Sequence, residues 1–292
     1  MRRMAAALFL VVAGLVAAPA PPTRSQAAFT ATATIGVFAD FARQVGGDRV
    51  EVIQLLGDGV DPHDYQMVPA DLVAVNRSQL LIYNGLGLEP FLGQVLTGAG
   101  RPGLTLVQLS EGLTPIMTGS SPNPHFWLDP QFAMRYVERI RDAFVAADPA
   151  GADVYQANAA AYIAQLTALD AELERQLSQV PAENRKLVTM HDAFPYFARR
   201  YGFEVIGGVL SSEAQEPSPN QLVALMRQVR QARVRAVFVE PQFNPRLLDQ
   251  VAREAGIQVL PTYSDAFPPD GSIRTYAEMM RVNVRDIVAG LR

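Results

Sequence analysis

Three histidines and one aspartate are the residues of this chain best suited to chemistry. His63 lies in GVDPHDYQ, His125 in SPNPHFWLDP and His191 in VTMHDAF, so each occurs in a short polar loop. The separations are 125 − 63 = 62 and 191 − 125 = 66 residues, and a similar step reaches the loop acid Asp265 in LPTYSDAF. Three imidazole nitrogens and one carboxylate form a donor set that a borderline-soft divalent ion such as zinc binds in tetrahedral geometry. The pattern therefore predicts one metal ion held by four loops.

Prolines restrict the backbone beside two of these histidines. Pro62 precedes His63 and Pro124 precedes His125, and a proline fixes its own φ angle. An imidazole held on such a backbone loses little entropy when it binds a ligand. A single loop histidine is more often solvated or structural than ligating, so the metal prediction depends on the set of four.

The N-terminal segment MRRMAAALFLVVAGLVAAPAPPTRSQAA has the layout of a secretory signal peptide. Two arginines precede an apolar run from Met4 to about Ala18, and small residues then offer a cleavage site. The alternative is a membrane-spanning helix, but the run is shorter than the roughly 20 apolar residues that a bilayer core requires, and Pro19 ends it. We therefore expect residues 1–28 to be removed on export.

Composition adds a prediction of location and excludes one class of partner. The chain has no cysteine, which excludes thioether lipidation and disulfides. We therefore expect a periplasmic protein that diffuses freely and is not lipid-anchored. The formal net charge of −4, without a basic cluster, gives no support to nucleic-acid binding.

Short apolar runs of strand length alternate with helix-like segments along the chain. This alternation is typical of βαβ units and predicts an α/β fold with mostly parallel sheets. Ligands of such sheets bind beyond the carboxyl ends of the strands, and His63, His191 and Asp265 each follow a predicted strand. The predicted strands are Ala33–Val37, Val50–Leu56, Gln79–Tyr83, Leu187–Met190, Val205–Gly207, Ala236–Val239 and Gln258–Leu260.

One long helix is expected between two sets of strands. The segment from Ala152 to Val180 contains no proline or glycine, and its tyrosines and leucines recur on one helical face. A mature chain of roughly 265 residues exceeds the size that one core usually supports. We therefore expect two (β/α) lobes, over residues 29–148 and 181–292, joined by this helix over residues 149–180. The metal site would lie in the cleft between the lobes.

Four motifs resemble those of a known family. GVDPHDYQMVPADL, NPHFWLDP, VTMHDAFPYFARRYGFEVIG and VFVEPQFNPRLLDQVAREAGIQVL are similar, in this order, to motif regions of the substrate-binding proteins of zinc and manganese ABC transporters. The resemblance covers nearly the whole mature chain. It implies two lobes joined by one long helix, one divalent ion in the cleft, a membrane permease as partner, and a monomer.

The resemblance also implies the ligands and the metal. The family's ligand positions fall on His63, His125, His191 and Asp265 of this chain. Manganese-type members usually have glutamate at the third position and zinc-type members histidine, so His191 favours Zn²⁺ over Mn²⁺, which prefers more oxygen ligands. Zinc-type members often have a His-rich loop before the second histidine. The corresponding stretch here, Ile116 to Asn123, is short and has no histidine, so we expect no auxiliary zinc site.

Two alternative functions follow from the same residues. A manganese or iron carrier could use the same scaffold. A zinc-dependent hydrolase would need an open coordination position for water, whereas four protein ligands leave none. No HExxH, HxHxDH or GxSxG pattern occurs either. We therefore expect a carrier and not an enzyme.

Other acidic residues near the predicted ligands have two interpretations. Asp64, Asp192 and Glu240 could hold ligating imidazoles through the second ring nitrogen, or they could be helix caps and solvated loop residues. Glu240, at the end of a predicted strand, is the strongest of the three candidates. Release of the ion requires a ligand to withdraw, and Asp265, on a loop rich in proline and glycine, is the expected mobile ligand.

Overall fold

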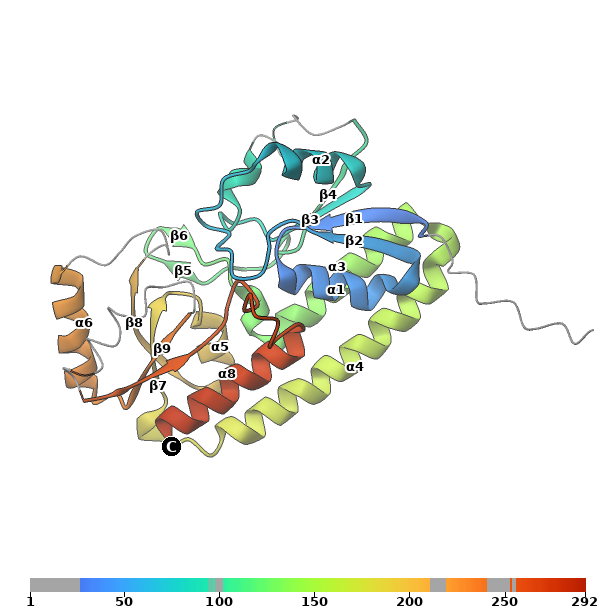
Figure 1. Cartoon of the computed structure of the whole chain (residues 1–292). Coiled ribbons are helices and arrows are strands. Elements are labelled where there is room, and N and C mark those ends of the chain that lie inside the picture. The colour runs from blue at the N-terminus through green and yellow to red at the C-terminus, as the bar shows by residue number, and fades with distance from the viewer. Residues whose placement is uncertain are drawn as a thin grey trace, which may run out of the picture.

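The computed structural model describes residues 27–93, 95, 97, 102–210, 219–240, 253 and 256–292. Over these residues the chain forms two four-stranded sheets with helices packed around them (Figure 1). The predicted signal peptide, residues 1–28, lies outside the described part except for its last two residues. Within the described part, no helix is both long and apolar enough to cross a membrane.

The first sheet is parallel throughout. Strand β1 lies between β2 and β3, and β4 pairs with β3, which gives the order β2-β1-β3-β4. All four residues of β3 are buried, as expected for a parallel strand covered on both faces. The elements of this part are β1 (Phe29–Ala33), α1 (Gly36–Gly46), β2 (Val50–Gln54), α2 (Pro69–Arg77), β3 (Leu80–Tyr83), β4 (Thr105–Gln108), the antiparallel pair β5 (Met117–Thr118) and β6 (Ser121–Pro122), and α3 (Pro130–Ala147).

The second sheet is also parallel, with the order β10-β9-β7-β8. Its elements are β7 (Lys186–His191), α5 (Pro195–Tyr201), β8 (Glu204–Leu210), α6 (Pro219–Ala232), β9 (Ala236–Val239), β10 (Gln258–Pro261) and α8 (Tyr276–Leu291). Two parallel sheets with flanking helices confirm the predicted α/β class. We call residues 27–147 the first half and residues 186–292 the second half.

Helix α4 (Ala152–Leu177) connects the two halves and runs along the molecule (Figure 1). The apolar residues that predicted this helix, from Tyr155 to Leu177, are buried. Helix α8 packs against α4, and its first residue contacts the first half, because the Tyr276 main-chain N–H donates to Asp40 Oδ2 at 2.8 Å. Both helices therefore bridge the halves.

One cluster of buried apolar side chains extends from the first sheet through α3, α4 and α8 to the second sheet. It begins at Phe29 in β1 and includes Leu291 at the end of α8. Close-packed interiors resist small displacements, so this shared core fixes how the two sheets present their loops to each other.

The first predicted strand, Ala33–Val37, is wrong in position. Strand β1 ends at Ala33, and α1 begins at Gly36. Ile35 and Val37 are buried although they belong to the turn and to the helix start, and an apolar run alone cannot distinguish a strand from a buried helix start. Strand β4 is not predicted by the apolar pattern because two of its four residues are exposed.

Candidate metal site

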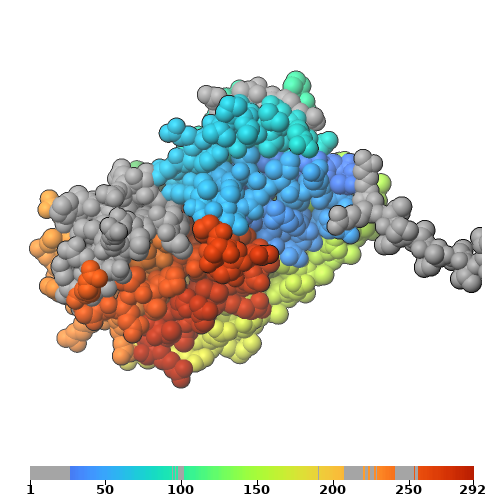
Figure 2. All heavy atoms as spheres, in the orientation of Figure 1, coloured from blue at the N-terminus to red at the C-terminus, as the bar shows by residue number. Residues whose placement is uncertain are grey.

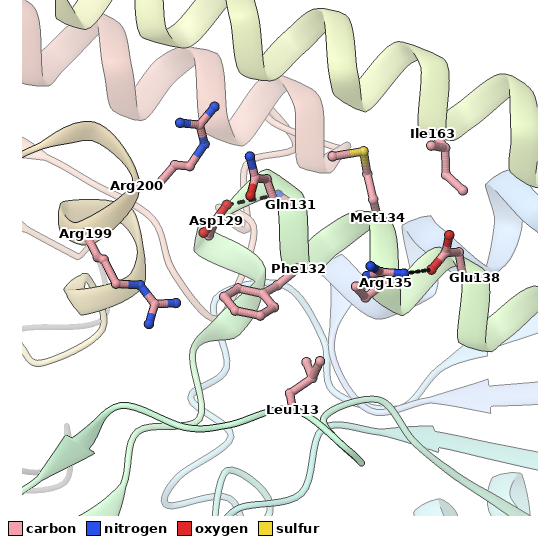
Figure 3. A pocket seen from close by; sticks show the side chains of 10 residues that line it. All are labelled: Leu113, Asp129, Gln131, Phe132, Met134, Arg135, Glu138, Ile163, Arg199 and Arg200. Atoms are coloured by element: carbon pink, nitrogen blue, oxygen red, sulfur yellow. Dashed lines mark hydrogen bonds and ion pairs between the residues drawn. The ribbon is translucent and has the colours of Figure 1, made fainter.

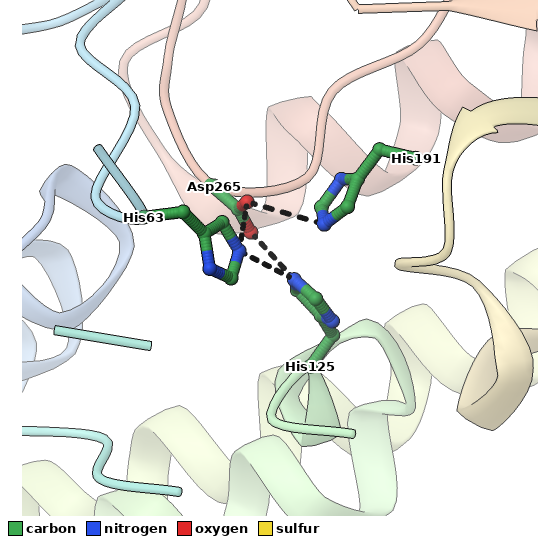
Figure 4. Close-up of side chains that lie close together, drawn as sticks. All are labelled: His63, His125, His191 and Asp265. Carbon is green, nitrogen blue, oxygen red and sulfur yellow. Dashed lines mark hydrogen bonds and ion pairs between the residues drawn. The ribbon is translucent and has the colours of Figure 1, made fainter. Parts of the chain in front are cut away.

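Four side chains from distant parts of the chain converge on one point (Figure 4). His63 Nε2 lies 3.3 Å from His125 Nε2 and 3.4 Å from Asp265 Oδ2. His125 Nε2 lies 3.5 Å from Asp265 Oδ1, and His191 Nε2 lies 4.0 Å from Asp265 Oδ2. One ligand atom from each residue can be chosen so that all four lie within 4.8 Å of one another. The structure therefore brings together the four residues singled out in the sequence.

Each half contributes two of these residues. His63 lies in the loop between β2 and α2, and His125 immediately precedes the short 3₁₀ helix Phe126–Leu128 that leads into α3. His191 is the last residue of β7, and Asp265 lies in the segment between β10 and α8. Two parallel sheets thus direct loops from the carboxyl ends of their strands toward a common point, as such sheets commonly do for ligands.

Asp265 is a buried carboxylate that lacks ordinary partners. Its side chain is 0% exposed, and among the described residues neither carboxylate oxygen finds a hydrogen-bond donor. Burial alone raises the pKa of Asp265, but the facing imidazoles, His125 first, outweigh this effect and hold the pKa well below its usual range. An ionised, buried carboxylate needs a compensating positive charge, and a divalent cation among these donors supplies it.

The His125 imidazole is held in its neutral form. Burial lowers the pKa of His125 to about 4, an effect only partly opposed by Asp265. Its Nδ1 atom lies 3.0 Å from Asn123 Oδ1, which leaves Nε2 directed at the cluster. The Trp127 ring packs 5.3 Å from the His125 ring, centroid to centroid, as the sequence suggests for the only tryptophan.

His191 is supported by the predicted acidic residue Glu240. The His191 Nδ1 atom lies 3.3 Å from Glu240 Oε2, and both side chains are almost completely buried. The Ser264 hydroxyl contacts Glu240 Oε1 from the loop that carries Asp265. A carboxylate behind a ligating imidazole fixes the ring orientation and increases its basicity.

The loop that carries Asp265 is attached to the first half. Trp127 Nε1 donates to the Ser264 carbonyl at 2.9 Å, and the Gly59 main-chain N–H donates to the Phe267 carbonyl at 2.8 Å. Figure 2 shows the orange-red surface of this part of the chain against the blue surface of the first half. These bonds oppose the expectation that Asp265 is the mobile ligand, because its loop has main-chain anchors on both sides.

Asp192, another of the acidic candidates, has a different partner from the one suggested by the sequence. Its Oδ2 atom accepts a hydrogen bond from Thr118 Oγ1 at 2.7 Å, so its carboxylate joins the β5–β6 hairpin to the second half. Thr118, Asp192 and the three histidines all line one pocket of about 180 Å³. The β5–β6 hairpin therefore lines the pocket that contains the three histidines.

A buried acid that sequence reasoning missed stabilises the loop behind His125. Glu89 accepts hydrogen bonds from Thr34 Oγ1 at 2.9 Å and from the main-chain N–H groups of Asn84 at 2.8 Å and Gly85 at 3.0 Å. Asn84 in turn donates to the Pro124 carbonyl at 3.0 Å. Burial raises the pKa of Glu89 to about 7. The only sequence signal for this role is an acid within a glycine-rich turn after a strand.

A second pocket, of about 740 Å³, lies between α3, α4 and α5 (Figure 3). Its charged groups already have protein partners: Asp129 caps α3 by accepting from Gln131 N at 2.9 Å, and Arg200 pairs with Asp170 at 2.6 Å. None of its lining residues is a histidine. This pocket therefore lacks the donors of the site in Figure 4.

The spacing of the donors fits a small tetrahedral ion. Zinc bonds of about 2.0–2.1 Å in a tetrahedron place the ligand atoms about 3.3–3.4 Å apart. His63 Nε2 lies at this distance from His125 Nε2 (3.3 Å) and from Asp265 Oδ2 (3.4 Å). His125 Nε2 lies 3.5 Å from the other carboxylate oxygen, Oδ1, and His191 Nε2 lies 4.0 Å from Oδ2. With all four donor atoms within 4.8 Å of one another, the cluster is close to the size of a tetrahedral zinc site.

Two parallel sheets joined by one long helix, with a nitrogen-rich donor cluster between them, define a class of metal-binding substrate-binding proteins. The chain belongs to the family described as zinc-uptake complex component A, periplasmic, whose sequence profile matches residues 32–290.

Individual relatives share the whole domain. The manganese-binding lipoprotein MntA of Halalkalibacterium halodurans is 33% identical, over 88% of this chain and 87% of that protein. The iron-binding protein YfeA of Yersinia pestis is also 33% identical, over 98% of this chain and 96% of that protein. The solved periplasmic zinc binding protein TroA of Treponema pallidum superposes with a TM-score of 0.85 at 30% identity, and the match covers 90% of this chain and 99% of that one. All are named as binding proteins and none as an enzyme, which argues against the hydrolase alternative.

The comparisons contradict the predicted location. The sequence predicts a protein that diffuses freely and is not lipid-anchored, yet MntA and several other relatives are named lipoproteins, a class held at a membrane surface. The prediction of an unanchored protein rests on the absence of cysteine, and residue composition is too narrow a basis for locating a protein several of whose relatives are named lipoproteins. The prediction of a free, unanchored protein is therefore wrong.

Proposed function

We propose that this chain is the substrate-binding component of a metal ABC transporter and that its substrate is Zn²⁺. The observation that supports this function is the buried cluster of three imidazole nitrogens and one carboxylate with the donor spacing of a tetrahedral zinc site. His63, His125, His191 and Asp265 each supply one bond. Four protein ligands leave no coordination position for water, which suits capture and transfer and not hydrolysis.

The choice of zinc follows from the donor atoms. Nitrogen-rich tetrahedral sites suit Zn²⁺, whereas Mn²⁺ prefers more oxygen ligands and a higher coordination number. The second candidate is a manganese or iron carrier, because relatives are named as manganese-binding and iron-binding proteins. The additional carboxylate of Glu240 lies behind His191, where it faces Nδ1 and not the cluster.

Competition between metals tests the proposal. Metal-stripped protein is titrated with Zn²⁺ and with Mn²⁺ in the presence of a competing chelator. Binding of Zn²⁺ in a one-to-one ratio, with a large excess of Mn²⁺ needed to displace it, is the expected result. Tighter binding of Mn²⁺ would reverse the assignment of the substrate, and no binding of either ion would refute the function.

The organisation of the chain follows from this function. We propose that residues 1–28 are a signal peptide and that residues 29–148 and 181–292 are the lobes, joined by the helix over residues 149–180. Relatives are named as substrate-binding lipoproteins of manganese ABC transporters, which supports a membrane permease as the partner that receives the ion. Loss of import in cells that lack this chain, restored by the wild-type gene but not by a His125→Ala variant, would test the partnership.

A further inference from the structure

Asn123 contacts the loops of two proposed ligands from opposite halves. Its Oδ1 atom lies 3.1 Å from the main-chain N of His125 and 3.0 Å from His125 Nδ1. Its Nδ2 atom lies 2.6 Å from the main-chain oxygen of Asp192, the residue that follows His191. The Asn123 residue is only 4% exposed, so water does not compete for these contacts. One amide group therefore connects the two sides of the site.

The main-chain partners determine which end of the amide faces which loop. The main-chain N–H of His125 can only donate, so the amide oxygen must face it, and the carbonyl of Asp192 can only accept, so the amide nitrogen must face it. With an acceptor beside it, His125 Nδ1 must carry its hydrogen. A neutral imidazole protonated at Nδ1 has its lone pair on Nε2, the atom that faces His63 and Asp265.

The backbone of Asn123 is also fixed. Pro122 and Pro124 flank it and restrict the chain on both sides. Its own main-chain N–H donates to the Ile116 carbonyl at 2.8 Å, and its carbonyl accepts from Tyr196 Oη at 2.7 Å. The amide therefore stands at a defined position relative to His125, as an orienting group must.

We propose that Asn123 is a positioning residue of the metal site, which holds His125 with Nε2 toward the ion and ties this loop to the main chain beside His191. The proposal rests on the metal-binding function proposed above. Asparagine suits both tasks because one planar group carries an acceptor and a donor. Aspartate retains the acceptor and loses the donor, and alanine loses both.

The difference between these two replacements provides the test. Zn²⁺ affinity is measured by chelator competition for the wild-type protein and for Asn123→Ala and Asn123→Asp. We expect Asn123→Ala to bind about 10-fold more weakly or worse, the range found for residues that orient ligating histidines. Asn123→Asp should recover part of this loss, because its carboxylate still accepts from His125 Nδ1. If Asn123→Ala binds as tightly as the wild type, or if Asn123→Asp is as weak as Asn123→Ala, the assignment is overturned.

The visible spectrum of Co²⁺-loaded protein separates orientation of the ligand from general packing. The Asn123→Asp variant is expected to retain the wild-type tetrahedral bands, and Asn123→Ala to shift them, because only the alanine variant frees the His125 ring. Unchanged bands in Asn123→Ala would refute the orienting role. If that variant does not fold, Asn123→Ser replaces it, since its shorter side chain does not reach both partners.

A matched control uses a similar amide elsewhere in the molecule. Asn158 on α4 donates to the Val45 carbonyl at 3.1 Å, so Asn158→Asp makes the same chemical change at a helix contact. Its Zn²⁺ affinity should stay within about twofold of the wild type. The proposed function and the role of Asn123 fail on different results. Failure of the wild-type protein to bind Zn²⁺ refutes the proposed function. Wild-type binding that is lost in His63→Ala but unchanged in Asn123→Ala refutes only the role of Asn123.

Discussion

The two imidazoles His125 and His191 differ in the group behind the ring. In the first half, His125 Nδ1 lies 3.0 Å from the neutral amide oxygen of Asn123. In the second half, His191 Nδ1 lies 3.3 Å from the carboxylate of Glu240. Each histidine is only 2% exposed, so solvent access does not distinguish them. An amide fixes the ring without adding charge, whereas a carboxylate also makes the imidazole a stronger electron donor.

This difference shows how charge is distributed across the site. The buried carboxylates Asp265 and Glu240 belong to the second half, and the first half supplies two imidazoles, of which His125 is supported by a neutral amide. The second half therefore provides the negative charge that attracts a divalent ion. The first half provides nitrogen ligands, which favour zinc over harder ions.

Removal of either imidazole is expected to have the largest effect, and it tests whether His125 and His191 contribute equally to metal binding. His125→Ala and His191→Ala each remove one of four donors, and each should weaken Zn²⁺ binding by more than about 100-fold, beyond the effect of losing an orienting residue. Chelator competition measures both affinities. Asp265→Ala is expected to lose less, because three nitrogens remain. Wild-type affinity in either histidine variant would remove that ring from the site.

The pH dependence of stability tests the contribution of His125, in the first half. Burial lowers the pKa of folded His125 to about 4, below the ordinary value of 6.5 that applies to the unfolded chain. The unfolded chain therefore takes up a proton first as pH falls. The metal-free protein should lose about 2 kcal/mol of unfolding free energy through His125 between about pH 7.5 and pH 5. Chemical denaturation of the wild type and of His125→Gln measures this contribution, and an equally steep pH dependence in both proteins would contradict it.

Glu89 contributes in the opposite direction. Because burial raises its pKa to about 7, the folded chain retains a proton that the unfolded chain has released, and stability from this residue falls as pH rises from about 4.5 to 7. Glu89 is present in both the wild type and His125→Gln. Its effect therefore cancels when the two curves are subtracted.

Glu240→Gln places a neutral amide behind His191, so that both histidines are supported by the same kind of group. The amide oxygen still accepts from Nδ1, but the charge is lost, and Zn²⁺ affinity should fall by about 10-fold. Glu183→Gln, an exposed residue with the same change of charge, serves as the control in the same chelator assay. Equal or tighter binding by Glu240→Gln would show that the contrast between the two sides has no energetic consequence.

Thr118→Val gives the smallest expected effect. Thr118 Oγ1 donates to Asp192 Oδ2 at 2.7 Å, and Thr118 is exposed. Loss of one such bond changes a free energy by about 1 kcal/mol, so Zn²⁺ release should accelerate by about fivefold at most. Stopped-flow mixing of loaded protein with a chelator measures the rate. Slower release from Thr118→Val would show that the hairpin does not restrain the second half.

The four converging side chains could be proposed from the sequence, but of the groups that support them only Glu240 could. His63, His125 and His191 are conspicuous because the chain has only three histidines and each lies in a polar loop. Glu240 could be proposed as a candidate from its position after a strand. Asn123 looks like an ordinary turn residue between two prolines, and nothing local indicates that its amide reaches Asp192, 69 positions away.

In the fold, too, the features set by neighbouring residues could be predicted, whereas the contacts between distant residues could not. Alternating apolar runs predicted the parallel sheets, and one uninterrupted amphipathic segment predicted α4, because periodicity is a local property. The attachment of the Asp265 loop depends on Trp127 Nε1 and the Ser264 carbonyl, which are 137 residues apart. Such a pairing arises only after the sheets have packed together, so the loop's proline and glycine content could not indicate these anchors, and the mobility of Asp265 stays a prediction.

The hydrogen bonds that cross the site have a mechanical consequence. Trp127 with Ser264, Gly59 with Phe267, and Asn123 with Asp192 join the halves without using any of the four donor side chains. Each of these bonds adds about 1 kcal/mol to the free energy needed to separate the halves. Spontaneous separation of the halves is therefore rare, and a protein that meets no partner able to separate them should release its ion slowly.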